Sequence, residues 1–305
     1  MKIGILQGAE GIDATVSEIV KIAKAAEKLG LDSLWSTDIR TTDPISALTI
    51  AGMETSKIEL GTAVTPIHAR HPMALAQQSM TAAQVCKGRF TLGLGVSHSK
   101  IVEDSLGLSY AQPALYMKEY LEVLLPLLRN EIVSFNGKFF KVDNLQTRVP
   151  GVKSLPVVIA ALGPAMLQLA GTISAGTSTW MVGPKTLQSH VVKRIQKTAF
   201  DANRREIRII AAFPLVLTNH PETARAELSK KLKKYGGLPS YRAMLEKEGI
   251  SDPAELALIG DEKELRAKID IIQSVGVTDF SAAIISADKK EDFDRSLAFL
   301  GSLKT

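Results

Sequence analysis

The sequence predicts an α/β fold, a (β/α)8 barrel of the TIM type with insertions after the fourth and seventh strands. Eight short β-rich runs recur along the 305 residues, and most are followed by a longer segment with helical periodicity. The runs are almost continuously apolar, which is typical of strands in a parallel sheet covered on both faces. Barrels routinely reach this length as one unit, so a single domain is expected over residues 1–305.

The first half of the chain alternates four strands with three helical segments. The first helix is expected over 15–29, because its apolar residues recur at helical spacing and Gly30 provides a stop. The strands of this half are expected at 2–6, 32–38, 58–64 and 89–96, and the later helices at 44–55 and 72–86.

A longer segment follows the fourth strand. It contains the helix YMKEYLEVLLPLLRN (116–130), with Pro126 near its end. The run VSFNGKFFKV (133–142) has Asn136-Gly137 at its centre, and this pair predicts a two-residue hairpin turn. This segment is the first insertion.

The second half supplies the remaining four strands, expected at 155–161, 177–182, 207–217 and 279–286. A helical insertion over about 220–258, a helix over 262–275 and a C-terminal helix complete the pattern. The alternative is an open doubly wound sheet, whose first turn carries G-x-G-x-x-G. The first turn here reads QGAEGIDAT, which favours the barrel.

Composition excludes several function classes. The 37 Lys+Arg against 32 Asp+Glu give a net charge of +5, but only 5% of residues are aromatic and they do not interleave with the basic cluster KKLKK (230–234). We therefore expect no nucleic acid partner and interpret the charge as attraction for an anionic ligand. The single Cys86 excludes a disulfide framework. No apolar run of about 18 residues and no signal peptide stand out, so we expect no membrane partner and a cytoplasmic location.

The expected strand ends carry few reactive side chains. Active sites of such barrels lie at the carboxyl ends of the strands. No lysine stands there to form a Schiff base, and Asp38 is the only carboxylate, too little for a magnesium centre. The spacing of His68 and His71 gives only weak support for a metal site, and no metal is expected. We call the end of the barrel formed by the carboxyl ends of the strands the mouth. A mouth with so few reactive side chains suits a reaction driven by an organic cofactor.

His98, directly after GLGVS in the fourth strand, is the best proton-transfer candidate, because histidine exchanges a proton near neutral pH. A structural role in the loop is equally compatible with its position. Asp38 has two interpretations as well: it accepts a hydrogen bond from a heterocycle, or it caps the next helix. Trp35 and Trp180 are expected in the core, and His190 and His220 on the surface.

Two neighbouring strand-to-helix turns share a Gly-Pro start, AALGPA (160–165) and MVGPKT (181–186). Backbone N–H groups at such helix starts can hold a phosphate without basic side chains. Tight packing turns explain the same residues. Gly93 and Gly95 in the fourth strand indicate close approach, by a ligand or by a neighbouring strand.

Five stretches in order resemble the luciferase-like flavin and deazaflavin oxidoreductases: AEKLGLDSLWSTD (26–38), LGTAVTPIHARHP (60–72), GRFTLGLGVSH (88–98), LPVVIAALGPA (155–165) and GVTDFSAAI (276–284). The resemblance spans nearly the whole chain and is weakest in the two insertions. The GVSH and GVTDF endings and the YMKEYLEVLLPLL helix are similar to the branch that uses coenzyme F420, a deazaflavin.

The resemblance implies a barrel with the cofactor ring in its mouth. Asp38 would lie at the ring, with Ala63-Val64, often joined by a non-proline cis peptide, packed behind it. Gly95, Val96 and Ser97 would line the ring, and His98 would face the substrate as the catalytic residue. The phosphate would be held by residues of the two turns, namely Ala161, Leu162, Gly163, Met181, Val182 and Gly183.

The implied activity is hydride transfer between F420 and a small organic substrate, at a CH–OH or CH–CH type group, by an enzyme that forms a homodimer. The alternatives are an FMN-dependent monooxygenase of the same fold and a flavin-binding protein without catalysis. Two positions depart from the family pattern. Ile39 replaces the histidine that the sugar-phosphate dehydrogenase branch uses as its base, and Leu162 replaces a glycine of the phosphate turn.

Overall fold

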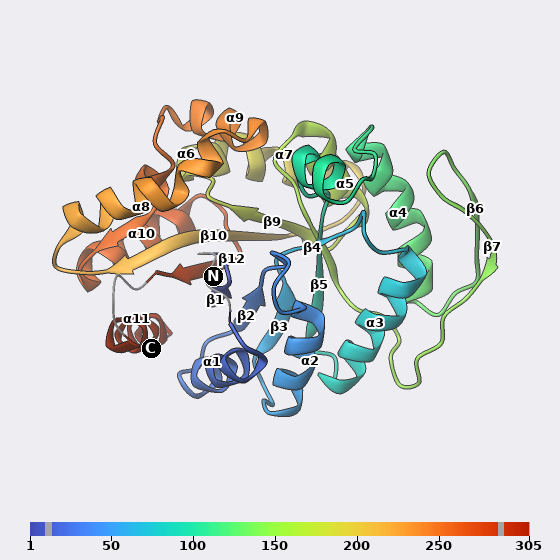
Figure 1. The fold of residues 1–305 in the computed structure, drawn as a ribbon, viewed down its shortest axis with the longest axis horizontal. Helices are drawn as coiled ribbons and strands as arrows, with labels where there is room; N and C mark the ends of the chain where they lie inside the picture. The colour runs from blue at the N-terminus through green and yellow to red at the C-terminus, as the bar shows by residue number, and fades with distance from the viewer. Residues whose placement is uncertain (10–13, 286–289, 305) are drawn as a thin grey trace.

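The computed structural model describes residues 1–9, 14–285 and 290–304, and its centre is a closed barrel of parallel strands (Figure 1). Each barrel strand pairs with the next, and pairing of the sixth with the seventh completes the ring. The barrel strands are β1 (Lys2–Gln7), β2 (Ser33–Ser36), β3 (Glu59–Thr62), β5 (Phe90–Gly95), β8 (Val157–Ala160), β9 (Gly176–Trp180), β10 (Arg208–Leu217) and β12 (Asp279–Ile284). The predicted fold class is confirmed.

Two short strands extend the barrel sheet. β4 (Thr65–Pro66) pairs with the end of β5, and β11 (Leu258–Gly260) pairs with the end of β10. Neither was expected as a separate strand, because two or three residues carry too little periodicity to be recognised. The predicted end of the eighth strand, Ser286, lies outside the described residues.

Helices surround the barrel (Figure 1). Of the described helices, none is long and apolar enough to cross a membrane. They are α1 (Val16–Lys28), α2 (Pro44–Met53), α3 (Pro72–Val85), η1 (Ile101–Ser105), α4 (Pro113–Leu128), α5 (Pro164–Ile173), α6 (Pro184–Thr186), η2 (Leu187–Val192), α7 (Lys193–Asp201), α8 (Pro221–Gly236), α9 (Pro239–Glu248), η3 (Pro253–Leu256), α10 (Glu262–Ser274) and α11 (Lys290–Ser302).

The first three helices begin where the sequence provides capping side chains. Thr15 and Glu18 form a capping box at α1, and Asp43 accepts from the Ser46 amide at α2. At α3 the cap is His71, whose Nδ1 accepts from the Met73 amide over 3.2 Å. Gly30, with φ 77°, follows the end of α1 and confirms the predicted stop.

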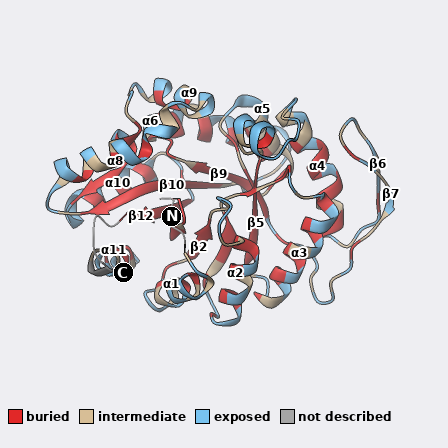
Figure 2. Cartoon of the chain, in the orientation of Figure 1, coloured by how far each residue is buried: buried red, intermediate tan, exposed pale blue. Residues whose placement is uncertain are grey.

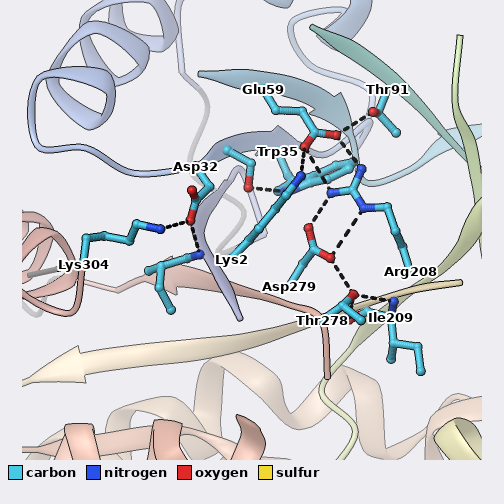
Figure 3. A network of polar contacts seen from close by, with 12 residues as sticks. Lys2, Asp32, Trp35, Glu59, Thr91, Arg208, Ile209, Thr278, Asp279 and Lys304 are labelled. Atoms are coloured by element: carbon cyan, nitrogen blue, oxygen red, sulfur yellow. Dashed lines mark hydrogen bonds and ion pairs between the residues drawn. The ribbon is translucent and has the colours of Figure 1, made fainter. Parts of the chain in front are cut away.

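The amino-terminal end of the barrel is closed by a polar network (Figure 3). Arg208 donates to Glu59 over 2.6 and 3.1 Å and also to Asp279, and each of these three is the first residue of its strand. Thr91 donates to Glu59 over 2.6 Å, and Lys2 pairs with the same carboxylate over 3.2 Å. Since the charges neutralise one another inside the barrel, this end is a structural plug.

Next to the plug, an apolar cluster that includes Leu6, Trp35 and Val158 fills part of the interior. Trp35 is fully buried, as predicted, and its Nε1 donates to the Ser33 hydroxyl over 2.9 Å. Gly61 gives the ring its space: a Cβ there would lie 2.2 Å from the indole. The buried residues between the strands and the helices packed on them form one large hydrophobic cluster, and two smaller clusters include Trp35 and Leu232 (buried residues are red in Figure 2).

The first insertion contains α4 and a hairpin that stands apart from the barrel, formed by β6 (Val133–Asn136) and β7 (Lys141–Leu145) (Figure 1). The predicted two-residue turn is wrong: Asn136 pairs with Lys141, so four residues connect the strands. The reason is distant in sequence. The buried carboxylate of Glu119 on α4 accepts from the amides of Lys138, Phe139 and Phe140 over 2.9, 2.7 and 3.3 Å.

The second insertion is helical, as predicted, and contains α8, α9 and η3 before β11. The basic cluster lies on α8, with Lys230, Lys231, Lys233 and Lys234 exposed and Leu232 buried against the barrel side. The cluster is therefore the solvated face of an amphipathic helix.

Candidate active site

Buried polar atoms without a hydrogen-bond partner gather at the carboxyl ends of the strands. Among the described residues, such atoms occur on Thr37, Thr65, His68 and Trp180, each at or just after the end of a strand, and on Ser281 within β12. Buried polar groups in folded proteins are satisfied by protein, water or ligand. The polar atoms concentrated at this end of the barrel are therefore available to bind water or a ligand.

Backbone conformations that are rare for residues with a side chain occur at the same end. Arg40, Ser97 and Met181, which follow β2, β5 and β9, have φ of 70°, 60° and 53°. Such left-handed residues often occur at functional sites. The peptide bond between Ala63 and Val64 is cis, as the resemblance implied.

Asp38 is paired rather than free. Its carboxylate accepts from Nη1 of Arg70 over 3.0 Å, and Nη2 of the same guanidinium donates to Asp43 over 3.0 Å. The helix-capping interpretation of Asp38 does not hold, because Asp43 caps α2. Arg70 has no local sequence pattern that marks it as the partner of Asp38, 32 positions earlier.

The two glycines of β5 face the segment that contains the cis peptide. A Cβ at Gly93 would lie 1.9 Å from the Thr62 carbonyl oxygen, and a Cβ at Gly95 would lie 2.5 Å from a methyl of Val64. Both glycines therefore permit the close approach of the neighbouring strand and the segment that follows it. Of the two explanations expected for these glycines, a ligand or a neighbouring strand, the structure supports the strand. Ala63 and Val64 are half-buried at this position.

The segment Val96–Ser97–His98 leaves β5 half-buried at the mouth. The His98 ring lies 6.0 Å from the ring of Tyr241 on α9, between centroids. Burial lowers the pKa of His98, so its imidazole is neutral over a wider range around neutral pH. A neutral imidazole next to a ligand site can accept a proton.

His68 is buried between two tyrosines of the first insertion. Its ring stacks on Tyr116 at 4.5 Å and on Tyr110 at 5.6 Å, between centroids, and neither ring nitrogen has a partner among the described residues. Burial lowers the pKa of His68. His71 is directed elsewhere, to its capping role at α3. No cluster of metal-binding side chains occurs in the described part of the chain.

The turn before α5 is open. The predicted residues Leu162 and Gly163 precede Pro164, the helix has no side-chain cap, and a Cβ at Gly163 would meet nothing within 4 Å. His190 on η2 contacts the Leu162 carbonyl oxygen through Nε2 over 2.8 Å, so it is a half-buried positioning residue and not the surface histidine that was expected. Ala161, which precedes this turn, is fully buried.

The turn before α6 is closed by the protein itself. Glu248 on α9 accepts from the amides of Lys185 and Thr186 over 3.2 and 2.7 Å. A Cβ at Gly183 would lie 2.1 Å from the carboxyl carbon of Glu248. The side chains of Met181 and Val182 are buried. Of the two predicted phosphate turns, the turn at Gly163 has no side-chain cap, whereas Glu248 binds the amides at the start of α6.

The tyrosines near the mouth are not predicted by any motif in the sequence. All five tyrosines of the chain, Tyr110, Tyr116, Tyr120, Tyr235 and Tyr241, lie in the two insertions. Tyr235 packs edge-on against Trp180 at 6.2 Å, and Tyr241 packs against Tyr235 at 5.1 Å. Trp180, expected in the core, is half-buried at the mouth. Their exclusive presence in the insertions is the one sequence feature that could have revealed them.

The fold is thus an α/β barrel, and its candidate site lies at the carboxyl ends of the strands. The chain belongs to the luciferase-like monooxygenase family, because the sequence model of that family, described as "Luciferase-like monooxygenase", matches residues 1–279.

Named relatives and solved structures agree with this assignment. A 5,10-methylenetetrahydromethanopterin reductase from Methanolobus tindarius is 31% identical over 249 residues, which cover 80% of this chain and 74% of that protein. The structure of the coenzyme F420 dependent tetrahydromethanopterin reductase from Methanopyrus kandleri superimposes with a TM-score of 0.80 at 23% identity, covering 99% of this chain and 96% of that one. A type II Baeyer–Villiger monooxygenase from Pseudomonas putida, in complex with FMN, superimposes with 0.78 at 16% identity, covering 99% and 96%. These two structural similarities show the fold alone.

Proposed function

We propose that the protein is an F420-dependent oxidoreductase that transfers a hydride between the deazaflavin and a small organic substrate. The observation that carries the proposal is the mouth itself, where unpartnered buried polar atoms and an open, uncapped helix start occur together. F420 is favoured over FMN because the sequence relatives are named methylenetetrahydromethanopterin reductases and the similar tetrahydromethanopterin reductase structure from Methanopyrus kandleri is described as coenzyme F420 dependent.

The residues at the mouth fit a phosphate-bearing cofactor with a planar ring. The exposed amides at the start of α5 suit a phosphate, because helix amino-termini bind anions. We assign Leu162 and Gly163 to this contact and the backbone of Ala161 beside it. The cofactor ring is assigned to Asp38, Ala63-Val64 and Gly95–Ser97. The second turn, Met181–Gly183, is assigned a lining role, since Glu248 occupies the amides that follow it.

Bound F420 would supply the ring carbon that gives or accepts the hydride. The Arg70 guanidinium holds the Asp38 carboxylate in place and balances its charge. His98 is assigned the paired proton transfer: its neutral ring would accept the hydroxyl proton of a substrate that loses a hydride, or return it in the reverse direction. Tyr110 and Tyr241, one from each insertion, lie next to Ser97 and His98 and would limit the access of water to this space.

The experiment that tests the cofactor is a binding titration of the protein with F420 and FMN side by side. We expect tighter binding of F420. Tight binding of FMN with none of F420 would favour the FMN monooxygenase alternative. Binding of either cofactor without turnover of any acceptor would favour a flavin-binding protein.

Replacement of His98 tests the catalytic assignment. His98→Ala should slow turnover by about a hundredfold, in the range of general acid–base catalysis, and leave the dissociation constant of F420 unchanged. His220→Ala is the matched control, since His220 is exposed at the start of α8. Equal turnover of the His98→Ala and His220→Ala proteins would remove His98 from the mechanism.

Three further expectations accompany the proposal: residues 1–305 form one domain, the protein acts in the cytoplasm, and it is a homodimer. Exposed Ile50 and Met53, one turn apart on α2, offer apolar side chains for the dimer. Sedimentation equilibrium tests the dimer: the expected mass is twice 32.9 kDa, and a monomer at all concentrations would contradict it.

A further inference from the structure

The hydroxyl of Tyr110 reaches the backbone next to His98. It donates a hydrogen bond to the carbonyl oxygen of Ser97 over 3.1 Å. Ser97 has φ 60°, in the left-handed region that disfavours residues with a Cβ. The hydrogen bond from Tyr110 to this carbonyl therefore stabilises a backbone conformation that is unfavourable for serine.

The ring of Tyr110 is itself held firmly. It stacks on His68 at 5.6 Å with an angle of 27°, and His68 stacks on Tyr116 at 4.5 Å with an angle of 12°. His68 is only 9% exposed. The phenol group is therefore placed by a stack of three rings anchored to the loop after β4.

The other side of His98 is fixed as well. Its carbonyl oxygen accepts from the amides of Ile101 and Val102 over 2.9 and 3.0 Å, at the start of η1. With Ser97 held by Tyr110 and the His98 carbonyl held by these two amides, the direction of the His98 side chain depends on the left-handed turn at Ser97.

We propose that Tyr110 is a positioning residue: by holding the Ser97 carbonyl, its hydroxyl fixes the turn that directs His98 into the mouth. This inference deepens the proposed function and rests on it, because the orientation of His98 matters for catalysis only if His98 transfers the proton. Without the hydroxyl, Ser97 relaxes toward a common backbone conformation and the imidazole leaves its place beside Tyr241.

The test compares Tyr110→Phe with Tyr116→Phe. Both substitutions keep the ring that stacks on His68, and only the first removes the bond to Ser97. The pKa of His98 is measured by NMR in the cofactor-free protein, with its resonance identified by its loss in His98→Gln. The wild-type pKa should lie below the ordinary value. Tyr110→Phe should raise the His98 pKa toward its ordinary value, because the freed ring becomes more solvated, and Tyr116→Phe should leave it unchanged.

Binding and turnover give the second readout. Tyr110→Phe should keep the dissociation constant of F420 within about twofold and lower kcat about tenfold, as expected for the loss of one orienting hydrogen bond. A His98 that titrates in Tyr110→Phe as in the wild type overturns the proposal. If the His98 pKa shifts but the protein binds neither F420 nor FMN, the positioning role stands and the proposed function fails.

Ser97→Gly tests the route through the backbone. Glycine adopts φ 60° without penalty, so the turn depends less on the hydroxyl. The shift of the His98 pKa caused by Tyr110→Phe should therefore be smaller in the Ser97→Gly variant than in the wild type. An equal shift in both backgrounds would contradict the role of the Ser97 turn.

Discussion

Replacing Arg208 by methionine removes the cation at the amino-terminal end of the barrel. Arg208 is the shared partner of Glu59 and Asp279 (Figure 3). Its removal leaves Glu59 with Thr91 and Lys2. Asp279, whose side chain is 3% exposed, keeps among the described residues only the Thr278 hydroxyl, over 2.6 Å.

An uncompensated buried carboxylate costs about 3–5 kcal/mol. We expect the free energy of unfolding to fall by about 3 kcal/mol, the lower end, because the Glu59 side chain is still 16% exposed and keeps two partners. For a barrel of 305 residues that corresponds to a drop in Tm of roughly 5 °C. Arg295→Met is the control: its ion pair with Glu262 is about half exposed on both sides, and its loss should cost less than about 1 kcal/mol.

The assay is urea unfolding of both variants at neutral pH and at about pH 4. Burial tends to raise the pKa of Glu59, but Arg208 outweighs it and holds the pKa below the ordinary value. The Glu59 contribution is therefore present above the unfolded-state pKa and lost as the pH falls through the folded-state pKa, so the wild type should lose more stability on acidification than Arg208→Met. Binding of F420 should stay unchanged, since the plug lies opposite the mouth. An equal decrease in the free energy of unfolding at neutral pH in Arg208→Met and Arg295→Met would refute this reasoning.

Three other substitutions or modifications have defined outcomes. Glu119→Gln replaces a carboxylate that accepts hydrogen bonds from three amides, and it should lower the free energy of unfolding in urea by about 1.5–3 kcal/mol. A decrease smaller than that caused by losing an exposed ion pair would contradict the role of the carboxylate. Cys86 is fully buried, and burial raises its thiol pKa to about 11, so the folded protein should resist iodoacetamide and react only in urea; rapid labelling without urea would contradict its burial. Gly61→Ala forces a Cβ into the Trp35 ring and should cost about 1–3 kcal/mol, whereas Gly163→Ala should unfold like the wild type; equal stabilities would contradict the packing described here.

The sequence predicts the barrel because the information is local. Apolar runs of four to ten residues define the strands, and caps such as Thr15 and Asp43 lie within three residues of the amides they bind. The same locality explains the error at Asn136-Gly137. Its dipeptide pattern favours a tight turn, but the carboxylate of Glu119 on another element binds the following amides and stabilises a longer loop.

The site is less predictable for the same reason. Strand ends identify Asp38, Ser97 and His98 as residues of the mouth, since topology brings those ends together. Their partners come from elsewhere: Arg70 lies 32 positions from Asp38, and Glu248 lies 62 positions from Thr186. No periodicity or motif encodes such pairs.

The central claim is that the carboxyl-terminal mouth holds F420. A crystal structure of the protein with F420 tests it most directly. The ring should lie between Asp38 and the Val64–Ser97 side of the mouth, with the phosphate on the amides that follow Gly163. A cofactor bound at the amino-terminal plug or on the hairpin of the first insertion would contradict the claim, as would a phosphate that displaces Glu248 from the start of α6.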